Sequence, residues 1–399
     1  MPVKLVLGLQ HGDEGKGRVV DDLSQDWAEL VVRFQGGGNA GHTVYDHDGN
    51  KFVTHILPVG VLNKSVVSLI ARGCVVDIAD LYGEIQDLRV PPQKLRISGY
   101  CPIIEPMHKM SDRLKYQKKI GTTAKGIGPA YSDFYARDSY LIKDVIENPE
   151  KTLINIQNKF YNFQESRAQR GETLKDLQSD FDTFHVWCEN YYKISTFLKP
   201  YVILNDIEYI QEQYNEGTRI LLEGAQGSGL SIHSNNYPDV TSSAPSIGGA
   251  LNSTGLNHTQ IDEVIGVIKS YKTKVGSGDF PTQIHSEVAN TIAEIGKEFG
   301  ATTGRPRMCG WLDLDEVKSA VLQNGVNHIC VVKTDVMTHV DKPMYYVNEK
   351  FHSFPKINDV TTSDLGFSEL LRVIKDETRC KTISYTTGPK RGEIVWHAM

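Results

Sequence analysis

The chain has 399 residues, of which 40% are hydrophobic and 23% are charged, with a formal net charge of -6. This composition is that of a folded globular protein and excludes a largely disordered chain. The negative net charge argues against nonspecific binding to nucleic acid, no apolar run is long enough to cross a bilayer, and the six cysteines are too scattered for a disulfide framework or a zinc site. Because the first residues pass directly into a predicted strand without a signal-peptide pattern, we expect a cytoplasmic protein.

The first predicted strand, residues 3–10, leads into a loop with three glycines at residues 12–17, and a helix follows. Glycines let backbone N–H groups approach an anion, and the helix N-terminus adds the positive end of its dipole, so the loop is typical of a phosphate site. Asp13 and Glu14 add two carboxylates, which indicates that one of them binds a metal ion or accepts a proton. The loop differs from a Walker loop because its glycines are spaced differently and no Ser or Thr follows Lys16.

A second predicted strand, residues 30–34, also ends in a glycine-rich loop, residues 35–44. Strand, helix and strand in succession begin an α/β sheet, so we expect the two loops at the same edge of the sheet, where both can face one ligand. His42 is the one ionisable side chain of the second loop. A histidine among glycines favours a role in the site, and the alternative is a tight turn with a solvated histidine.

Further along the chain, segments with strand and helix patterns alternate, and polar glycine-rich loops follow several of the strands. We expect strands at 52–58, 66–70, 219–223, 264–271 and 329–332 and from residue 383, and helices at 78–88, 110–119, 288–299 and 315–322. Residues 149–214 are poor in glycine and carry apolar residues at helical spacing, which predicts an inserted helical subdomain. We therefore predict one α/β domain over 1–399, with a large, mostly parallel central sheet, flanking helices and phosphate-binding loops at strand ends.

Three of the later loops carry side chains suited to anions or to a base. Residues 120–131 offer threonines, backbone N–H groups and a lysine, although a flexible loop is the alternative. Arg305 and Arg307 lie in a loop rich in Thr and Gly, and their guanidinium groups suit a carboxylate or a phosphate, unless the loop is simply an exposed basic one. Asp335, just past a strand, can accept from the ring N–H and the exocyclic amine of guanine, or it can form an ordinary turn.

Taken together, these motifs resemble the adenylosuccinate synthetase family over nearly the whole chain. Eight motifs occur in the family's order: GDEGKG at 12–17, NAGHT at 39–43, GTT and GIGPAY around Thr123 and Tyr131, EGAQG at 223–227, VTSS at 240–243, GATTGRPR at 300–307, KTD at 333–335 and TTGP near the end. The resemblance implies a GTP- and Mg²⁺-dependent ligase of purine biosynthesis. Such an enzyme joins IMP to L-aspartate through a 6-phosphoryl-IMP intermediate and releases adenylosuccinate, GDP and phosphate.

The resemblance also implies catalytic roles for residues of the first two loops. The residue matching Asp13 removes the proton from the purine ring nitrogen and binds magnesium, for which the Gly41 carbonyl is a second ligand. The residue matching His42 supports the transferring phosphoryl group as a hydrogen-bond donor or acid, and Lys16 serves the same group. Positioning and neutralisation of charge are what phosphoryl transfer requires.

For the substrates, the resemblance implies three sets of binding residues. The purine monophosphate would contact Asp13, Glu14, Asn39, Thr123, Arg137, Gln226, Thr241 and Arg305, with Arg137 reaching the other subunit's site across a homodimer interface. The aspartate would contact Ala301, Thr302, Thr303, Arg305 and Arg307. GTP would contact Gly12, Gly15, Lys16, Gly17, Gly41, His42, Thr43, Arg307, Lys333, Asp335, Thr386 and Gly388.

Two other functions are compatible with these residues. A phage branch of the family uses dGMP in place of IMP and makes the 2-amino analogue, and in that branch the catalytic aspartate is often replaced. The presence of Asp13 favours IMP, while GMP or dGMP stays the alternative acceptor. A non-catalytic guanine-nucleotide-binding regulator could use the same loops as a switch, but it would not explain the paired carboxylates together with the Arg/Thr loop. We expect small-molecule partners and neither nucleic acid nor a membrane.

Overall fold

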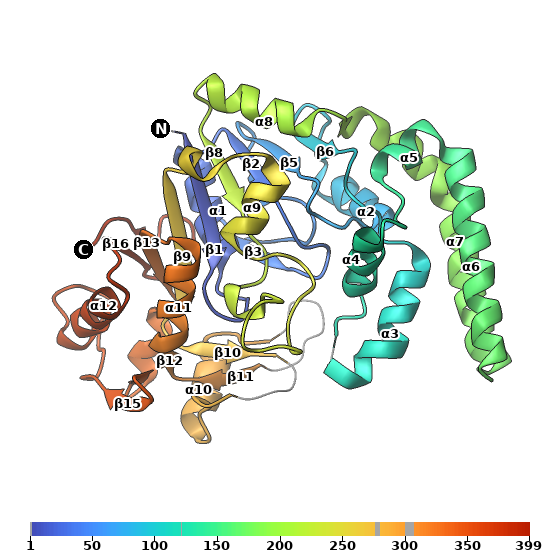
Figure 1. Ribbon diagram of the computed structural model, residues 1–399. Coiled ribbons are helices and arrows are strands. Elements are labelled where there is room, and N and C mark those ends of the chain that lie inside the picture. Colours follow the sequence, from blue (N-terminus) through green and yellow to red (C-terminus); the bar gives the residue numbers. More distant parts are fainter. Residues whose placement is uncertain (1, 121, 276–279, 300–306) are drawn as a thin grey trace.

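The computed structural model describes residues 2–120, 122–275, 280–299 and 307–399 (Figure 1). Its centre is a ten-stranded sheet in which all neighbouring strands run parallel except β17, which is antiparallel to β16 at one edge. The order across the sheet is β17 (Ile394–Val395), β16 (Thr382–Thr386), β13 (His328–Val332), β9 (Glu263–Lys269), β1 (Val3–Gly8), β8 (Ile220–Glu223), β2 (Leu30–Arg33), β5 (Val67–Ile70), β6 (Leu95–Ser98) and β7 (Val202–Ile203). The predicted α/β fold with a large, mostly parallel sheet is confirmed.

The described residues form twelve α-helices. They are α1 (Lys16–Asp26), α2 (Ile78–Leu88), α3 (Pro106–Ile120), α4 (Ile127–Ala136), α5 (Ile142–Glu147), α6 (Pro149–Gln169), α7 (Leu174–Leu198), α8 (Asp206–Asn215), α9 (Ile247–Thr254), α10 (Glu287–Ile295), α11 (Leu314–Asn324) and α12 (Leu365–Thr378). Figure 1 shows α6 and α7 side by side, at the opposite side of the molecule from α11 and α12.

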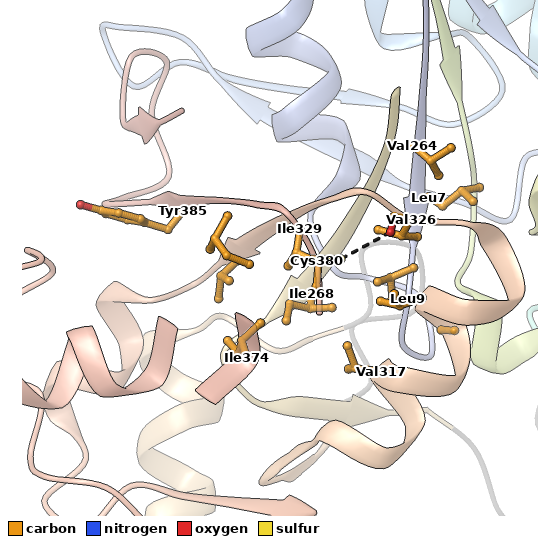
Figure 2. Packing of buried hydrophobic residues seen from close by; sticks show 14 of the residues in the cluster. Leu7, Leu9, Val264, Ile268, Val317, Val326, Ile329, Ile374, Cys380 and Tyr385 are labelled. Atoms are coloured by element: carbon orange, nitrogen blue, oxygen red, sulfur yellow. Dashed lines mark hydrogen bonds between the residues drawn. The ribbon is translucent and has the colours of Figure 1, made fainter. Parts of the chain in front are cut away.

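Strand β1 is buried on both faces of the sheet. Leu5 and Leu7 belong to one hydrophobic cluster, whereas Val6 belongs to another that includes Val19 and Val20 of α1. Successive side chains of a strand point to opposite faces, so a strand covered by helices on both sides reads as an unbroken apolar run. Figure 2 shows the first cluster, in which side chains of α11 and α12 pack against the strands.

The parallel strands end at one edge of the sheet, which brings their carboxyl-terminal loops together. The loops after β1 and β2 lie at the same edge, as predicted, although β8 is inserted between these two strands. The loops after β8, β13 and β16 lie at this edge as well. In open α/β sheets this edge is where ligands bind.

Several short elements differ from the sequence prediction. His42 does not lie in a loop but begins β3 (His42–Tyr45), which pairs with β4 (Lys51–Thr54) outside the main sheet. Strand β7 lies inside the segment predicted as a helical insertion and forms an edge of the main sheet.

Two further small sheets are formed by β10 (Lys272–Lys274) with β11 (Met308–Gly310), and by β12 (Leu312–Asp313), β14 (Met344–Val347) and β15 (Lys350–Ser353). Elements of two to four residues are too short to show a periodic pattern. The assignment of the whole chain to one domain with a helical insertion stays a prediction. Over the described ranges, no helix is both long and apolar enough to cross a membrane.

Candidate active site

A cavity of about 210 Å³ opens at the carboxyl ends of the parallel strands. It is lined by His11, Gly12, Asp13, Gly15, Lys16, Gly17, Asn39, Ala40, Gly41, His42, Thr43, Thr123, Gln226, Leu230, Lys274, Val275 and Arg307. Apart from His11, Ala40, Leu230, Lys274 and Val275, all of these are residues that the sequence predicted as site residues. Six separate segments of the chain, at residues 11–17, 39–43, 123, 226–230, 274–275 and 307, therefore meet around one space.

A larger cavity of about 760 Å³ lies between α3 and the α6–α7 pair, and of its lining residues only Ala124 belongs to a loop that was predicted to bind an anion. Two of its cations are already paired with carboxylates. Nη2 of Arg113 lies 2.7 Å from Oδ1 of Asp180, and Nζ of Lys109 lies 2.5 Å from Oδ2 of Asp77. Size alone does not identify a reaction centre, and the polar groups that chemistry needs converge on the smaller cavity.

The two carboxylates of the first loop have different surroundings. Glu14 is fully buried, and its side chain accepts hydrogen bonds from the backbone N–H groups of Gln10 and Gly12, at 3.1 and 2.8 Å, and from Nζ of Lys16, at 2.6 Å. Asp13 has a left-handed backbone with φ of 58°, and its side chain is 37% exposed. The geometry assigns Glu14 to the interior of the loop and leaves Asp13 facing the cavity.

Glu14 was predicted to contact the purine monophosphate, but the structure places it behind the cavity wall. A Cβ atom at Gly8 or Gly227 would lie 2.3 Å from an oxygen of Glu14, so both positions require glycine for this carboxylate to fit. The loop thus folds around Glu14, because a buried carboxylate must satisfy its oxygens with nearby donors.

His42 is held by Glu223, a residue for which the sequence predicted no role. Its Nδ1 lies 2.6 Å from Oε1 of Glu223, and Oε2 of Glu223 accepts a hydrogen bond from the backbone N–H of Val59 at 2.8 Å. Burial lowers the pKa of His42, although the hydrogen bond to Glu223 acts in the opposite direction. With Nδ1–H donated to the carboxylate, Nε2 is the ring nitrogen left for a ligand.

A chain of hydrogen bonds joins four polar side chains beside this histidine. Nε2 of Gln226 donates to Oδ1 of Asn39 at 3.3 Å, and its Oε1 accepts from the hydroxyl of Ser243 at 3.1 Å. The hydroxyl oxygens of Ser243 and Thr241 are 3.2 Å apart. Asn39, Gln226 and Thr241, predicted separately as contacts of the monophosphate, are therefore one connected group, and Ser243 is a member that the prediction missed.

Arg307 joins Asp13 to a buried acidic residue. Its Nε lies 2.9 Å from Oδ2 of Asp13, and its Nη1 donates to Oε2 of Glu298 at 2.7 Å. Burial acts to raise the pKa of Glu298, but neighbouring cations, with Lys269 first, lower it to about 2. The predicted residues Ala301, Thr302, Thr303 and Arg305 lie outside the described residues.

The predicted guanine contacts come together across β13 and β16. The backbone N–H of Lys333 donates to Oγ1 of Thr386 at 3.2 Å, and the hydroxyl of Thr334 donates to the carbonyl oxygen of Thr386. Burial raises the pKa of Asp335 and lowers the pKa of Lys333. These side chains do not line the 210 Å³ cavity, but Nζ of Lys333 donates to the carbonyl oxygen of Gly296, two residues before Glu298, whose carboxylate binds Arg307.

Gly388 lies in the turn after β16, where a Cβ atom would meet Oε2 of Glu393 at 2.4 Å. Arg137, another residue of the predicted site, lies at the end of α4. It follows α4 in a left-handed conformation, is exposed and does not line the cavity. Two exposed aromatic residues precede it, Phe134 and Tyr135, which are 37% and 74% exposed.

The donors predicted for magnesium fit a hard cation. Asp13 offers a partly exposed carboxylate and Gly41 a backbone carbonyl, and both line the same cavity. Oxygen donors of this kind are what Mg²⁺ prefers in proteins.

Another cluster of possible metal ligands in the described part of the chain, Glu105, His108 and Asp133, fits a cation less well. Nδ1 of His108 accepts a backbone N–H, so the proton is on Nε2, which donates to Asp133. To bind an ion shared with Asp133, the histidine would have to turn the lone pair of Nε2 to the ion and donate a proton from Nδ1, which is the reverse of what the structure shows.

Comparisons with known proteins agree with these observations. The family model described as adenylosuccinate synthetase matches residues 5–391. The adenylosuccinate synthetase of Caldicellulosiruptor bescii is 35% identical over 98% of this chain and 99% of its own length. The chloroplastic adenylosuccinate synthetase of Chlamydomonas reinhardtii is 38% identical, covering 93% of this chain and 80% of that protein.

Two solved structures share the fold. The fully ligated adenylosuccinate synthetase of Plasmodium falciparum superposes with a TM-score of 0.89 at 26% identity, covering 99% of this chain and 100% of that chain. A cyanophage S-2L succinoaminodeoxyadenylate synthetase bound to dGMP and dATP superposes with a TM-score of 0.69 at 19% identity, over 99% of this chain and 95% of that one, which shows a common fold only. With the family model spanning nearly all of its length, the chain belongs to the adenylosuccinate synthetase family.

Proposed function

We propose that the 210 Å³ cavity is the site at which this chain joins IMP to L-aspartate with GTP, giving adenylosuccinate, GDP and phosphate through 6-phosphoryl-IMP. This is the reaction of its family, a GTP-dependent ligation that forms a C–N bond in purine biosynthesis. The observation that carries the assignment to this cavity is the placement of Asp13 and His42 on its wall, the first with an accessible carboxylate and the second oriented by Glu223.

Asp13 accepts the proton from the purine ring nitrogen as the purine oxygen attacks the γ-phosphate of GTP. Removal of this proton puts negative charge on the purine oxygen, which makes it the nucleophile. His42 binds the transferring phosphoryl group through Nε2, and Lys16 adds a positive charge to the same region. Because Nδ1 is turned to Glu223, His42 donates to the phosphoryl group through Nε2 when the ring carries a second proton, which burial disfavours and the Glu223 carboxylate favours.

Asn39, Thr123, Gln226 and Thr241 bind the IMP, and the hydrogen-bonded chain through Gln226 keeps three of them in fixed relation. Lys333, Asp335, Thr386 and Gly388 bind the guanine of GTP. Arg307 faces both the aspartate and the GTP. Asp13 and the Gly41 carbonyl would hold Mg²⁺, which supplies neutralisation of phosphate charge when it is bound.

We further propose a homodimer in which Arg137 binds the monophosphate in the partner's site. The exposed position of Arg137, away from its own cavity and next to exposed aromatic residues, supports this role, because such aromatic side chains are enriched at interfaces. We propose the cytoplasm as its location.

Asp13→Ala and His42→Ala test the assignment of the site. Each variant should fold, as judged by circular dichroism and a thermal unfolding curve close to that of the unaltered protein, and each should lose adenylosuccinate formation. Full activity in either folded variant would contradict the placement of the reaction at this cavity.

A further inference from the structure

Glu298 binds Arg307, which lines the cavity, and the reaction proposed above gives Glu298 no part. It follows α10 and is fully buried. Its carboxylate accepts hydrogen bonds from the hydroxyl of Tyr271 at 2.6 Å, from Nζ of Lys269 at 3.3 Å and from Nη1 of Arg307 at 2.7 Å. Its backbone carbonyl accepts the N–H of Arg307 at 3.0 Å. The carboxylate of Glu298 therefore binds the side chain of Arg307, and the backbone carbonyl of Glu298 binds the backbone of Arg307.

The surroundings of Glu298 keep it ionised. A buried carboxyl without partners would take up a proton, because burial penalises the charged form. Here three cations, Lys269, Lys333 and Arg307, compensate for the burial and hold the pKa of Glu298 at about 2. The carboxylate is thus a permanent acceptor for the guanidinium, and the bond between them is charge-assisted, which is the stronger kind.

The three nitrogen atoms of the Arg307 guanidinium have different surroundings. Nη1 donates to Glu298, whereas Nε lies 2.9 Å from Oδ2 of Asp13 as an ion-pair contact without a hydrogen bond. No residue within the described ranges accepts a hydrogen bond from Nη2, although the side chain is only 9% exposed and lines the cavity. A guanidinium anchored at one corner is preorganised, so a ligand carboxylate can bind the open corner without having to order the side chain.

We propose that Glu298 is a positioning residue for the amino-acid substrate, fixing Arg307 so that Nη2 points at a ligand carboxylate. This inference rests on the proposed function, in which Arg307 binds aspartate. The role is indirect, because Glu298 reaches the substrate only through Arg307. Loss of the anchor should therefore weaken binding of the dicarboxylic amino acid and leave binding of IMP unchanged.

The experiment compares steady-state kinetics of the unaltered protein with those of Glu298→Gln, varying aspartate, IMP and GTP in turn. Loss of one charge-assisted anchor should raise KM for aspartate roughly tenfold. KM for IMP should change less than about twofold, since no described residue of the IMP group contacts Glu298. Tyr271→Phe is the matched control, because it removes another donor to the same carboxylate and leaves the bond to Arg307 in place. Its KM for aspartate should stay within about twofold of the unaltered value.

A second comparison separates positioning from a general structural effect. If Glu298 acts through Arg307, then Glu298→Gln in an Arg307→Lys background should add less than about a twofold increase in KM for aspartate. Additive effects of the two changes, or an unchanged KM for aspartate in Glu298→Gln, would overturn the inference. Absence of ligase activity in the unaltered protein would instead refute the proposed function.

Glu298→Gln leaves the buried Lys269 without its counter-charge, which can prevent folding. The charge-balanced double variant Lys269→Met/Glu298→Gln and the charge-retaining Glu298→Asp provide the same test. Both variants weaken the contact with Nη1 of Arg307. Both should therefore raise KM for aspartate and leave KM for IMP unchanged. A value of KM for aspartate equal to that of the unaltered protein in either folded variant would also overturn the inference.

Discussion

Nδ1 of His42 lies 2.6 Å from Oε1 of Glu223, which joins the first residue of β3 to the last residue of β8. The carboxylate is itself fixed by the backbone N–H of Val59. This pair sets the tautomer and the orientation of the imidazole, so the ring nitrogen left for the phosphoryl group is Nε2. In the proposed mechanism Glu223 is therefore a positioning residue, since it orients His42 and does not line the cavity.

Replacing Glu223 should therefore slow the chemical step. We expect Glu223→Gln to lower kcat roughly 10- to 100-fold, because the imidazole loses the negative charge that favours its protonated form. KM for IMP and for aspartate should change little.

Glu263→Gln is a matched control for Glu223→Gln, since Oε1 of Glu263 also lies 2.6 Å from Nδ1 of a histidine, His328, but at the amino end of the sheet strands. A value of kcat close to that of the unaltered protein in Glu223→Gln, or an equal loss in the control, would contradict the role of Glu223.

The surroundings of the Glu263 carboxylate indicate how the free energy of unfolding should change with pH. Burial acts to raise the pKa of Glu263, but hydrogen bonds from His328 and Lys4 lower it to about 2 from an ordinary value of 4.5. A carboxyl whose pKa is depressed by folding stabilises the protein above the unfolded value, and this contribution is lost as pH falls from 4.5 towards 2.

Urea unfolding at pH 7 and pH 3 measures this effect. Glu263→Gln should lower the free energy of unfolding at pH 7 by on the order of 2 kcal/mol, and the difference from the unaltered protein should shrink at pH 3. A difference that is the same at both pH values would show that the carboxylate charge is not responsible.

We expect the carboxylate of Asp335 to select the base of the nucleoside triphosphate. Its carboxylate can accept from N1–H and the 2-amino group of guanine, whereas an asparagine amide donates to the C2 carbonyl of xanthine. Asp335→Asn should raise KM for GTP roughly tenfold or more and improve the relative kcat/KM for xanthosine triphosphate. Asp341→Asn, at an exposed position, is the control. Unchanged preference for GTP in Asp335→Asn would remove Asp335 from the guanine site.

Arg137 gives a test of the dimer. If each site takes Arg137 from the partner, then Asp13→Ala and Arg137→Ala are inactive separately, but a mixed dimer contains one site with both residues intact. Random exchange of subunits should restore about a quarter of the unaltered activity. Recovery of no activity after verified exchange of subunits would contradict the shared site.

Much of this site could be predicted because its residues sit at strand ends with a readable pattern. An apolar strand that ends in polar residues marks the segments at Asp13 and Asp335 from local sequence alone, with a glycine-rich loop at Asp13, and the parallel sheet brings the two segments to one edge. Glu223 was open to the same reasoning, because it is a lone carboxylate closing a buried strand. Its role depends on His42, which lies 181 residues away in the sequence, and no local pattern shows that contact.

Other features depend on contacts that no local pattern contains. The separate burial of Glu14 and exposure of Asp13 arise from the left-handed backbone at Asp13 and from space left by Gly8 and Gly227, one of which is more than two hundred residues away. Glu298 has an unremarkable place after a helix, and its role is visible only when Lys269 and Arg307 are seen around it.

A substrate panel tests the central claim most directly. Phosphate release and formation of the succinyl product are measured with IMP, GMP or dGMP, with GTP or ATP, and with or without L-aspartate. We predict turnover with IMP and GTP, strictly dependent on aspartate, with adenylosuccinate as the product. Turnover of dGMP or GMP without turnover of IMP would contradict the assigned acceptor, and GTP hydrolysis that needs no aspartate would contradict the ligase itself.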